Sequence, residues 1–343
     1  MNKLILVTGG TGYIGSHTTV ELMNRGYDVV IVDNLSNSAI EVLDGIERIT
    51  GKRPQFEKFD LCNWDALKDF LQTYTGIAAI IHFAASKAVG ESVEKPLMYY
   101  ENNLLSLINL LKGMKQSGIP GIVFSSSCTV YGQPDELPVT EHAPVKKAMS
   151  PYGNTKQISE EILADTLHTD QTLHCISLRY FNPIGAHPSA LIGELPIGTP
   201  ANLVPFITQT AAGVRKELQV FGNDYPTSDG SAIRDYINVV DLARAHVTAI
   251  ERMLGKKQKS SYEVFNLGTG RGYSVLELIR LFESATGAKV NYRIVDRRPG
   301  DIEQVWADTR FANEELGWKA TVSIEDTLRS AWNWEKHYRN LKQ

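Results

Sequence analysis

A glycine-rich loop near the start of the chain is the feature that most constrains its fold. In "VTGGTGYIGSH", Gly9, Gly12 and Gly15 directly follow an apolar run and precede a helix-like stretch. Glycines in this position permit a tight turn, let the backbone approach a pyrophosphate and let the helix pack closely on the strand. The free N–H groups at the start of the helix suit phosphate groups. The loop therefore predicts a strand–turn–helix unit that binds a dinucleotide.

An acidic residue at the end of the second apolar run, "DVVIVD", narrows the choice of dinucleotide. Asp33 lies 18 residues after Gly15, close to the spacing of a carboxylate that bonds the adenosine ribose. A carboxylate there repels a 2′-phosphate, and "DNLSNS" supplies no arginine or lysine to bind one. We therefore expect NAD as the cofactor rather than NADP.

The rest of the first half alternates strand-like and helix-like segments. The apolar runs "KLILVTG", "DVVIVD", "AAIIHFA" and "GIVFSSS" are separated by helix-compatible stretches such as "YYENNLLSLINLLKGMKQSG". This alternation is typical of βαβ units with right-handed crossovers, and it predicts an α/β fold with a doubly wound, Rossmann-like parallel sheet. We assign residues 1–181 to this NAD-binding domain. A returning segment near 236–268, with the runs "YINVV" and "YEVFNLG", is expected to rejoin its sheet.

After Phe181 the composition changes. The stretch "NPIGAHPSALIGELPIGTPANLVP" is rich in proline and glycine, which predicts loops that surround a ligand. We assign residues 182–343 to a smaller C-terminal, substrate-binding domain.

Composition argues against several classes of function. The formal net charge is −4 with acids and bases interspersed, so we expect no nucleic acid and no membrane as partner. Cys62, Cys128 and Cys175 lie far apart and match neither a metal site nor a disulfide framework, which fits a reducing compartment. The apolar run before Thr8 is too short for a signal peptide, and "IAAIIHFAA" is too short for a membrane span. We expect a cytoplasmic protein without a metal.

The stretch "SPYGNTK" contains a tyrosine and a lysine one helical turn apart. Ser150 suits a helix N-cap and Pro151 the first helical position, and apolar residues recur at helical spacing behind them. Tyr152 and Lys156 then share one face of the helix. Taken alone, this short pattern is more often a solvated helix face than a site.

Blocks along nearly the whole chain nevertheless match one family. They are "VTGGTGYIGSH", "HFAASKAVGESVEKP", "YYENN", "FSSSCTVYG", "SPYGNTK", "LRYFNPIGAHPS", "VFGNDYPTSDGSAIRDYINVVDLA", "FNLGTG" and "RRPGD". In this order they resemble the extended short-chain dehydrogenase/reductases and, within them, the UDP-glucose (UDP-galactose) 4-epimerases. The resemblance implies an NAD domain, a C-terminal domain for a UDP-sugar and a homodimer.

The resemblance also implies a catalytic set. Tyr152 and Lys156 would act with Ser127, the third serine of "SSSCTVYG". Tyr152 would take the proton of the sugar 4-hydroxyl while hydride leaves C-4, and hydride would return to the other face of the rotated 4-keto sugar. We expect the ammonium of Lys156 and the positive nicotinamide to lower the phenol pKa toward ~7, worth about 4 kcal/mol. Cys128, beside Ser127, is left without a role.

Residues expected to contact the cofactor or the substrate follow from the same match. The cofactor set is Gly9, Gly12, Tyr13, Ile14, Gly15, Asp33, Asn34, Asn37, Ser38, Asp60, Leu61, Phe83, Ala84, Lys87, Asn102, Tyr152 and Lys156. The substrate set is Ser127, Tyr152, Phe181, Asn182, Asn202, Phe221, Arg234, Arg298, Asp301 and Val305. Phe221 is expected beside the uracil, Arg234 and Arg298 at the diphosphate, and Asp301 at the ribose.

Substrate range depends on one position. Val305 matches the family site whose bulk limits the 2-substituent of the sugar, where tyrosine is associated with simple hexoses. Because valine is small, we hypothesise that UDP-N-acetylglucosamine and UDP-N-acetylgalactosamine are also interconverted. Their interconversion as the main activity is the alternative.

Four other functions are possible on the same fold: three enzymatic activities and one non-catalytic role. A 4,6-dehydratase usually carries an Asp-Glu pair ahead of "VYG", where this chain has Cys128 and Thr129, and a decarboxylase usually carries a glutamate in that region. A reductase would more often prefer NADPH, against Asp33. A non-catalytic NAD-binding regulator would commonly lack Tyr152 or Lys156.

Overall fold

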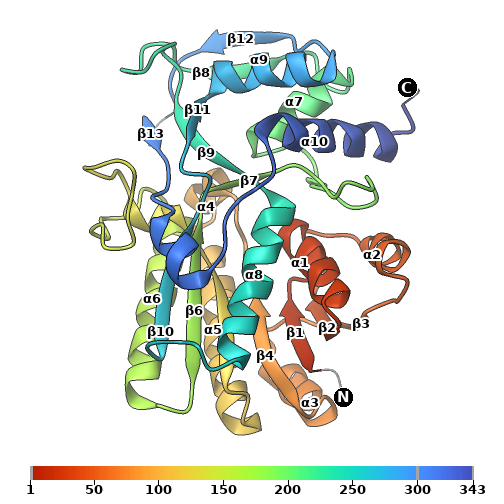
Figure 1. Cartoon of the computed structure of the whole chain (residues 1–343), viewed down its shortest axis with the longest axis vertical. Coiled ribbons are helices and arrows are strands. Elements are labelled where there is room, and N and C mark those ends of the chain that lie inside the picture. Colours follow the sequence, from red (N-terminus) through yellow and green to blue (C-terminus); the bar gives the residue numbers. More distant parts are fainter. Residues whose placement is uncertain (1–2, 299–300, 342–343) are drawn as a thin grey trace.

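A computed structural model describes residues 3–298 and 301–341 of the chain. Figure 1 shows a larger part built around one sheet and a smaller part above it that contains the C-terminal helix. The larger part holds a seven-stranded, wholly parallel sheet in the order β10-β6-β5-β4-β1-β2-β3. Its strands are β1 (Leu4–Thr8), β2 (Asp28–Asp33), β3 (Gln55–Lys58), β4 (Ile77–His82), β5 (Gly121–Ser127), β6 (His174–Tyr180) and β10 (Tyr262–Leu267).

Helices cover both faces of this sheet. Helices α1, α2 and α8 pack on one face, and α3, α5 and α6 on the other. Their bounds are α1 (Tyr13–Asn24), α2 (Val42–Thr50), α3 (Trp64–Thr73), α4 (Val89–Glu94), α5 (Pro96–Ser117), α6 (Pro151–Thr169) and α8 (Val239–Leu254). Successive strand residues point to opposite faces, so Ile5 and Val7 join one apolar core and Leu6 joins the other. The expected doubly wound sheet is confirmed.

The smaller part contains short strands and three helices. A four-stranded sheet combines β7 (Asn182–Ile184), β9 (Ile233–Asn238), β11 (Gly272–Ser274) and β13 (Gln304–Val305), and β8 (Leu218–Phe221) pairs with β12 (Tyr292–Val295). Helices α7 (Leu203–Ala211), α9 (Val275–Thr286) and α10 (Ile324–Tyr338) pack around a separate apolar core. Two single turns complete the chain, η1 (Cys128–Tyr131) and η2 (Ala312–Leu316).

One expected strand lies elsewhere than predicted. The run "YEVFNLG" forms β10 and joins the main sheet beside β6, as expected. The run "YINVV" does not: its first residues belong to β9 in the small sheet, and α8 begins at Val239. Because α8 then packs on the main sheet, the chain crosses between the two parts at Asn238, whose side chain caps α8.

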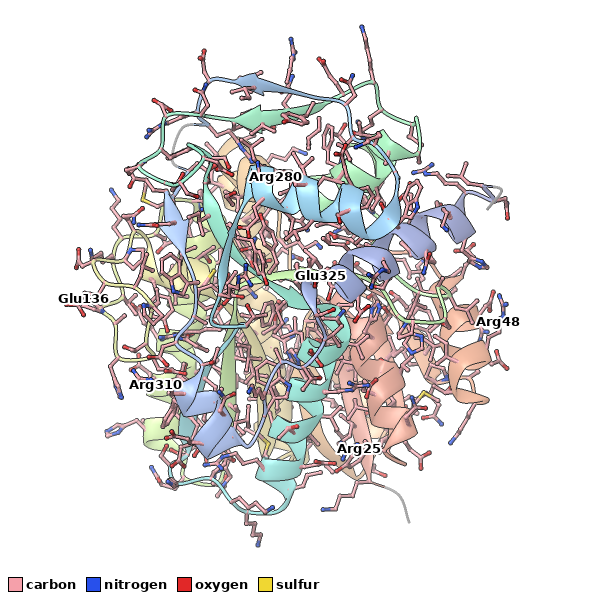
Figure 2. All side chains as sticks on the ribbon, turned by 45° about the horizontal axis from the view of Figure 1, so that its top comes forward. Arg25, Arg48, Glu136, Arg280, Arg310 and Glu325 are labelled. Carbon is pink, nitrogen blue, oxygen red and sulfur yellow. The ribbon has the colours of Figure 1, made fainter. Side chains whose placement is uncertain are left out.

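Charged side chains of both signs are spread over the surface (Figure 2). Arg25, Arg48 and Glu136 illustrate this on different sides of the molecule. Within residues 3–298 and 301–341, no helix is long and apolar enough to cross a membrane. The same residues contain no group of three or more His, Cys, Asp or Glu side chains suited to hold a metal ion.

Candidate active site

The predicted residues gather at the carboxyl ends of β1, β2, β4, β5 and β6, where the larger part faces the smaller one (Figure 1). The strand order reverses between β1 and β4, and crevices at such switch points are where ligands bind in open parallel sheets.

The glycine loop meets the requirements of a pyrophosphate site. Gly9 has φ +70°, and a Cβ on it would lie 2.7 Å from the backbone N of Ala84. A Cβ on Gly15 would lie 2.2 Å from the carbonyl oxygen of Gly9, so neither glycine has room for a side chain. Gly12 is the N-cap of α1 and makes no side-chain cap, and the first turn of α1 contains no acid. The N–H groups of this turn are thus left for an anion.

The predicted ribose acceptor is held beside this loop. The Asp33 carboxylate accepts from the N–H of Leu35 at 2.9 Å, the hydroxyl of Ser38 at 3.1 Å and the N–H of Thr11 at 3.3 Å. The hydroxyls of Thr11 and Ser38 also bond each other at 2.7 Å. Sequence reasoning missed Thr11, although it stands inside the glycine motif.

The expected adenosine residues are brought together only in part. Asn34 donates to Asp60 at 3.0 Å, and Leu61 is buried behind them. Burial acts to raise the pKa of Asp60, but hydrogen bonds from Cys62 and Asn34 bring this pKa below its usual value. Asn37 is exposed and stands apart from this group.

The segment after β4 passes over the glycine loop. The N–H of Phe83 donates to the carbonyl of Thr8 at 3.0 Å, which sets the loop against Phe83 and Ala84. Asn102 donates to the hydroxyl of Ser86 at 3.2 Å.

The neighbouring Asn103, which sequence reasoning missed, is buried and more fully bonded. It accepts from the N–H of Ser86 at 2.8 Å and donates to the carbonyl of Ser86 at 3.0 Å and to the hydroxyl of Thr155 at 3.1 Å. It thereby ties the segment after β4 to α6, which carries Tyr152 and Lys156.

The carboxylate of Glu194 contacts one residue predicted to bind the cofactor and one predicted to bind the substrate. Glu194 accepts from Asn202 at 2.6 Å and lies 3.7 Å from the ammonium of Lys87. The same ammonium lies 5.9 Å from the ring centre of Tyr13, whose hydroxyl donates to the carbonyl of Gly185 at 2.7 Å. Burial raises the pKa of Glu194. The structure thus brings a predicted cofactor residue and a predicted substrate residue to one buried group that the motifs did not indicate.

The catalytic candidates meet at the end of β5 and the start of α6. Ser150 caps α6 by accepting from the N–H of Gly153 at 3.1 Å, and Pro151 is the first helical residue, as predicted. Tyr152 is half-buried and lies beside the hydroxyl of Ser127, which acts to lower the tyrosine pKa. Lys156 is 4% exposed, and its ammonium lies 5.9 Å from the ring centre of Tyr152.

The three serines of β5 have different partners. The hydroxyl of Ser125 bonds that of Tyr180, and the hydroxyl of Ser126 donates to Glu160 at 2.5 Å. Ser127 instead accepts from the N–H of Thr129 at 3.2 Å, and its hydroxyl lies beside that of Tyr152, at the mouth of the site. The serine selected by its place in the motif is therefore also the one whose geometry suits the role.

The expected lowering of the Tyr152 pKa depends on NAD as well as on Lys156, and the chain alone shows a different balance. Burial raises the pKa of Tyr152 to about 12, the bond to Ser127 opposes this rise, and nearby Cys128 adds to it. The ammonium of Lys156 donates to the carbonyl of Ser125 at 2.7 Å. Burial also lowers the pKa of Lys156 to about 8, against an opposing effect of Glu160.

The substrate candidates line the small sheet and its loops. Arg234 pairs with Asp301 at 2.5 Å, and the guanidinium of Arg298 lies 4.4 Å from the ring centre of Phe221. Asn182 starts β7 and is half-buried.

The pairing of β13 with β9 places Val305 opposite Arg234. Val305 is buried in one apolar cluster with Phe181. This cluster joins the end of the main sheet to the small sheet.

Known proteins resemble this chain over nearly its whole length. A family model described as GDP-mannose 4,6 dehydratase matches residues 6–331. A UDP-glucose 4-epimerase of Bacillus subtilis (strain 168) is 51% identical over 331 residues, which cover 96% of each chain. The crystal structure of a UDP-glucose 4-epimerase from Stenotrophomonas maltophila, with bound NAD and formylated UDP-arabinopyranose, has a TM-score of 0.95 at 50% identity and 100% coverage of both chains. That of a Bifidobacterium longum UDP-glucose 4-epimerase with NAD⁺ and UDP has a TM-score of 0.94 at 48% identity, and covers 98% of this chain and 99% of its own.

Proposed function

The chain belongs to the extended short-chain dehydrogenase/reductases and, among them, to the UDP-glucose 4-epimerases, and we propose that it interconverts UDP-glucose and UDP-galactose with NAD as its bound cofactor. The observation that carries the proposal is the meeting of Tyr152, Lys156 and Ser127 beside a glycine loop suited to a dinucleotide.

The residues suited to hold NAD surround the switch point of the sheet. The glycine loop offers its open helix N-terminus to the pyrophosphate, and Asp33 offers a fixed carboxylate to the adenosine ribose. Asn34 and Asp60 border the adenine side, while Lys87 and Lys156 offer ammonium groups. The chemistry that NAD supplies when bound is the reversible acceptance of a hydride.

The chain itself supplies proton transfer and positioning. Tyr152 takes the proton of the 4-hydroxyl and later returns it, which contributes ~10²–10⁴-fold to the rate. Ser127 donates its hydroxyl hydrogen to the 4-oxygen and orients it. Because burial raises the tyrosine pKa to about 12, Tyr152 needs positive charge beside it before it can act as a base at neutral pH.

We assign the UDP-sugar to the smaller part, within residues 182–343. The Arg234–Asp301 pair offers an arginine fork for a diphosphate and a carboxylate for a ribose. Phe221, under the guanidinium of Arg298, offers an aromatic face to a base.

A dehydratase is the second candidate, since the matching family model carries that description. The chemistry of the site disfavours it. Cys128 and Thr129 stand beside Ser127 where a dehydratase needs an acid and a base, and burial raises the pKa of Cys128 to about 12. The thiol is therefore protonated at neutral pH and is a poor base.

Proton NMR of the purified protein with UDP-galactose in heavy water, without added NAD, tests the proposal. We expect UDP-glucose without deuterium at C-4, because the hydride returns within the site. Accumulation of a keto or deoxy sugar only after NAD is added would replace this function with a dehydrogenase or dehydratase.

The substrate range includes N-acetylated UDP-sugars in this proposal. Val305 is 3% exposed and packs with Phe181 and Ala307, so a larger side chain there has to move toward the sugar or displace this cluster. Val305→Tyr is expected to remove activity on UDP-N-acetylgalactosamine and to spare activity on UDP-galactose. A parallel fall of both activities would contradict this role of Val305.

The protein acts as a homodimer in this proposal, supported by an apolar row on α4 and α5. Val89 and Val93 lie one turn apart on α4 and Leu97 at the start of α5, and they are 50%, 63% and 81% exposed. A second copy of the same face would cover them. Light scattering should find a dimer for the wild type and a monomer for Leu97→Glu, with Val214→Glu, an exposed valine elsewhere, as control. A monomeric wild type would refute the proposal.

A cytoplasmic location is the last part of the proposal. It is supported by the three cysteines, all of which are free, as is usual in a reducing compartment.

A further inference from the structure

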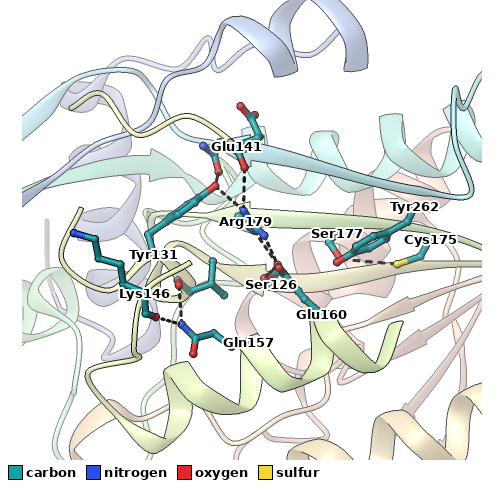
Figure 3. Close-up of polar contacts among 12 residues, drawn as sticks. Ser126, Tyr131, Glu141, Lys146, Gln157, Glu160, Cys175, Ser177, Arg179 and Tyr262 are labelled. Carbon is teal, nitrogen blue, oxygen red and sulfur yellow. Dashed lines mark hydrogen bonds and ion pairs between the residues drawn. The ribbon is translucent and has the colours of Figure 1, made fainter. Parts of the chain in front are cut away.

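A buried ion pair lies directly behind the catalytic residues. Glu160 on α6 and Arg179 on β6 are 8% and 7% exposed, and two hydrogen bonds of 2.9 Å and 2.5 Å join them. The Glu160 carboxylate also accepts from the hydroxyl of Ser126 on β5 at 2.5 Å. Figure 3 shows the three side chains converging between the helix and the two strands.

Each of these residues is adjacent to a catalytic one. Ser126 directly precedes Ser127, and Glu160 follows Lys156 by one turn of α6. Arg179 is the register partner of Ser126 across β5 and β6. One carboxylate thus joins the strand that carries Ser127 to the helix that carries Lys156.

A second layer of hydrogen bonds fixes Arg179. Its guanidinium donates to the hydroxyl of Tyr131 at 2.9 Å and to the carbonyl of Glu141 at 3.4 Å. Tyr131 in turn donates to the side chain of Asn266 at 2.7 Å, and the N–H of Asn266 donates to Glu141 at 2.7 Å. The arginine therefore cannot turn away from Glu160 without breaking bonds to two other segments, at Tyr131 and Glu141 (Figure 3).

The pair also places a charge beside a catalytic residue, since Glu160 acts to raise the pKa of Lys156. The other titratable groups that face Tyr152, Lys156 or Glu160 are Tyr99 on α5, His82 on β4, Cys128 in η1, Cys175 and Tyr180 on β6, and Tyr262 on β10. Burial raises the pKa of each of these tyrosines and cysteines and lowers that of His82 to about 3, so all are neutral at pH 7. The remaining titratable neighbours are Glu160 and Arg179, with Arg234 and Asp235 of β9 on the far side of Cys128.

We propose that Glu160 and Arg179 are positioning residues, which hold Lys156 and Ser127 at their working separation and balance the charge that Tyr152 and Lys156 experience. The proposal rests on the proposed function for the roles of these three residues. It assigns to the pair a task that no motif in the sequence indicated.

The test is the pH profile of kcat for two variants that remove opposite charges. Side chains one turn apart lie ~6 Å apart, and at an effective dielectric constant of ~20 a unit charge there changes a pKa by about 2 units. Glu160→Gln should shift the profile by about 1 to 2 pH units toward lower pH. Arg179→Met should shift it toward higher pH by a similar amount. Shifts in one common direction, or unmoved profiles in folded variants, would overturn the proposal.

Two further variants keep the test decisive if a single charge left buried prevents folding. Ser126→Ala introduces no unpaired charge, and should lower kcat several-fold without moving the profile. Glu160→Met/Arg179→Met removes both charges, and should keep the profile of the wild type with a lowered kcat. Wild-type kcat in both of these variants would overturn the positioning role.

The activity of the wild type on UDP-galactose shows whether the proposed function fails independently of the positioning role. If it does not convert UDP-galactose, the epimerase assignment fails. The charge effect is then measured from the ultraviolet absorbance of the Tyr152 phenolate, as the difference between each protein and its Tyr152→Phe counterpart. Opposite displacements of that titration in Glu160→Gln and Arg179→Met support the charge balance, and equal titrations refute it.

Discussion

Replacing Lys156 with methionine should make the protein more stable while it abolishes activity. The Lys156 side chain is 4% exposed, and burial lowers its pKa from 10.5 to about 8 in spite of Glu160. At pH 7 the lysine is charged in both folded and unfolded chains, and this pKa difference corresponds to about 3 kcal/mol of lost stability. Methionine has a similar length and no charge. It leaves the carbonyl of Ser125 without its donor, which costs about 1 kcal/mol. The net gain is about 2 kcal/mol.

The sign of the pH dependence follows from the same shift. Between pH 8 and 10.5 the unfolded chain binds more protons at this lysine than the folded one, so the wild type gains stability as pH rises through this window. The advantage of Lys156→Met should therefore be complete below pH 8 and should shrink toward pH 10.5.

Thermal unfolding of both proteins at several pH values measures this advantage. The data are extrapolated to zero NAD, because a ligand that binds the folded state adds its own stabilisation. Lys115→Met is the control, since Lys115 is 73% exposed in its pair with Asp170 and should change stability little. A Lys156→Met protein less stable than the wild type at pH 7, or an advantage that does not change with pH, would refute the reasoning.

Three other substitutions test the site. Gly15→Ala places a Cβ 2.2 Å from the carbonyl oxygen of Gly9, and the resulting steric strain costs about 1–3 kcal/mol. The variant should therefore lose NAD during purification, as measured by the nucleotide content after denaturation. Gly90→Ala, with open space at its Cβ, is the control and should retain NAD. Tyr152→Phe should keep the fold and the bound NAD and lower kcat by ~10²–10⁴-fold, and a rate near that of the wild type would exclude Tyr152 as the base. Burial lowers the pKa of His82 to about 3, so its protonation in the unfolded chain should reduce stability by about 2 kcal/mol between pH 7 and 5. His17 and His246 act in the same direction, so His82→Asn should remove only its own share of the loss in thermal scans, and an unchanged pH dependence would contradict the argument.

Features encoded in short stretches were predictable. The glycine loop, the acid at the end of β2 and the cap of α6 each depend on neighbours within about 20 residues, and the structure places all three as predicted. The choice of Ser127 over Ser125 and Ser126 stays a prediction, which the partners of the other two serines support.

Features that depend on distant segments were missed. The run "YINVV" reads as a strand of either sheet, and only the packing of α8 decides which one receives it. Glu194 lies in a loop without a motif, and its contacts with Lys87 and Asn202 come from segments on either side of the site. Asn103 was passed over for Asn102, because adjacent amides differ only in the direction that α5 gives them.

The sequence by itself determined the βαβ alternation, the dinucleotide loop and the family, since periodicity and motif spacing are local properties of the chain. The tertiary structure decided the electrostatics. Burial raises the pKa of Tyr152 and lowers that of Lys156, because a charged group loses favourable hydration where water is excluded. The spacing of residues in the sequence does not indicate which side chains become buried in this way. The tertiary structure also brought Glu160 and Arg179 together behind Tyr152 and Lys156. This contact depends on the order of the strands in the sheet, which cannot be inferred from any one segment of the sequence.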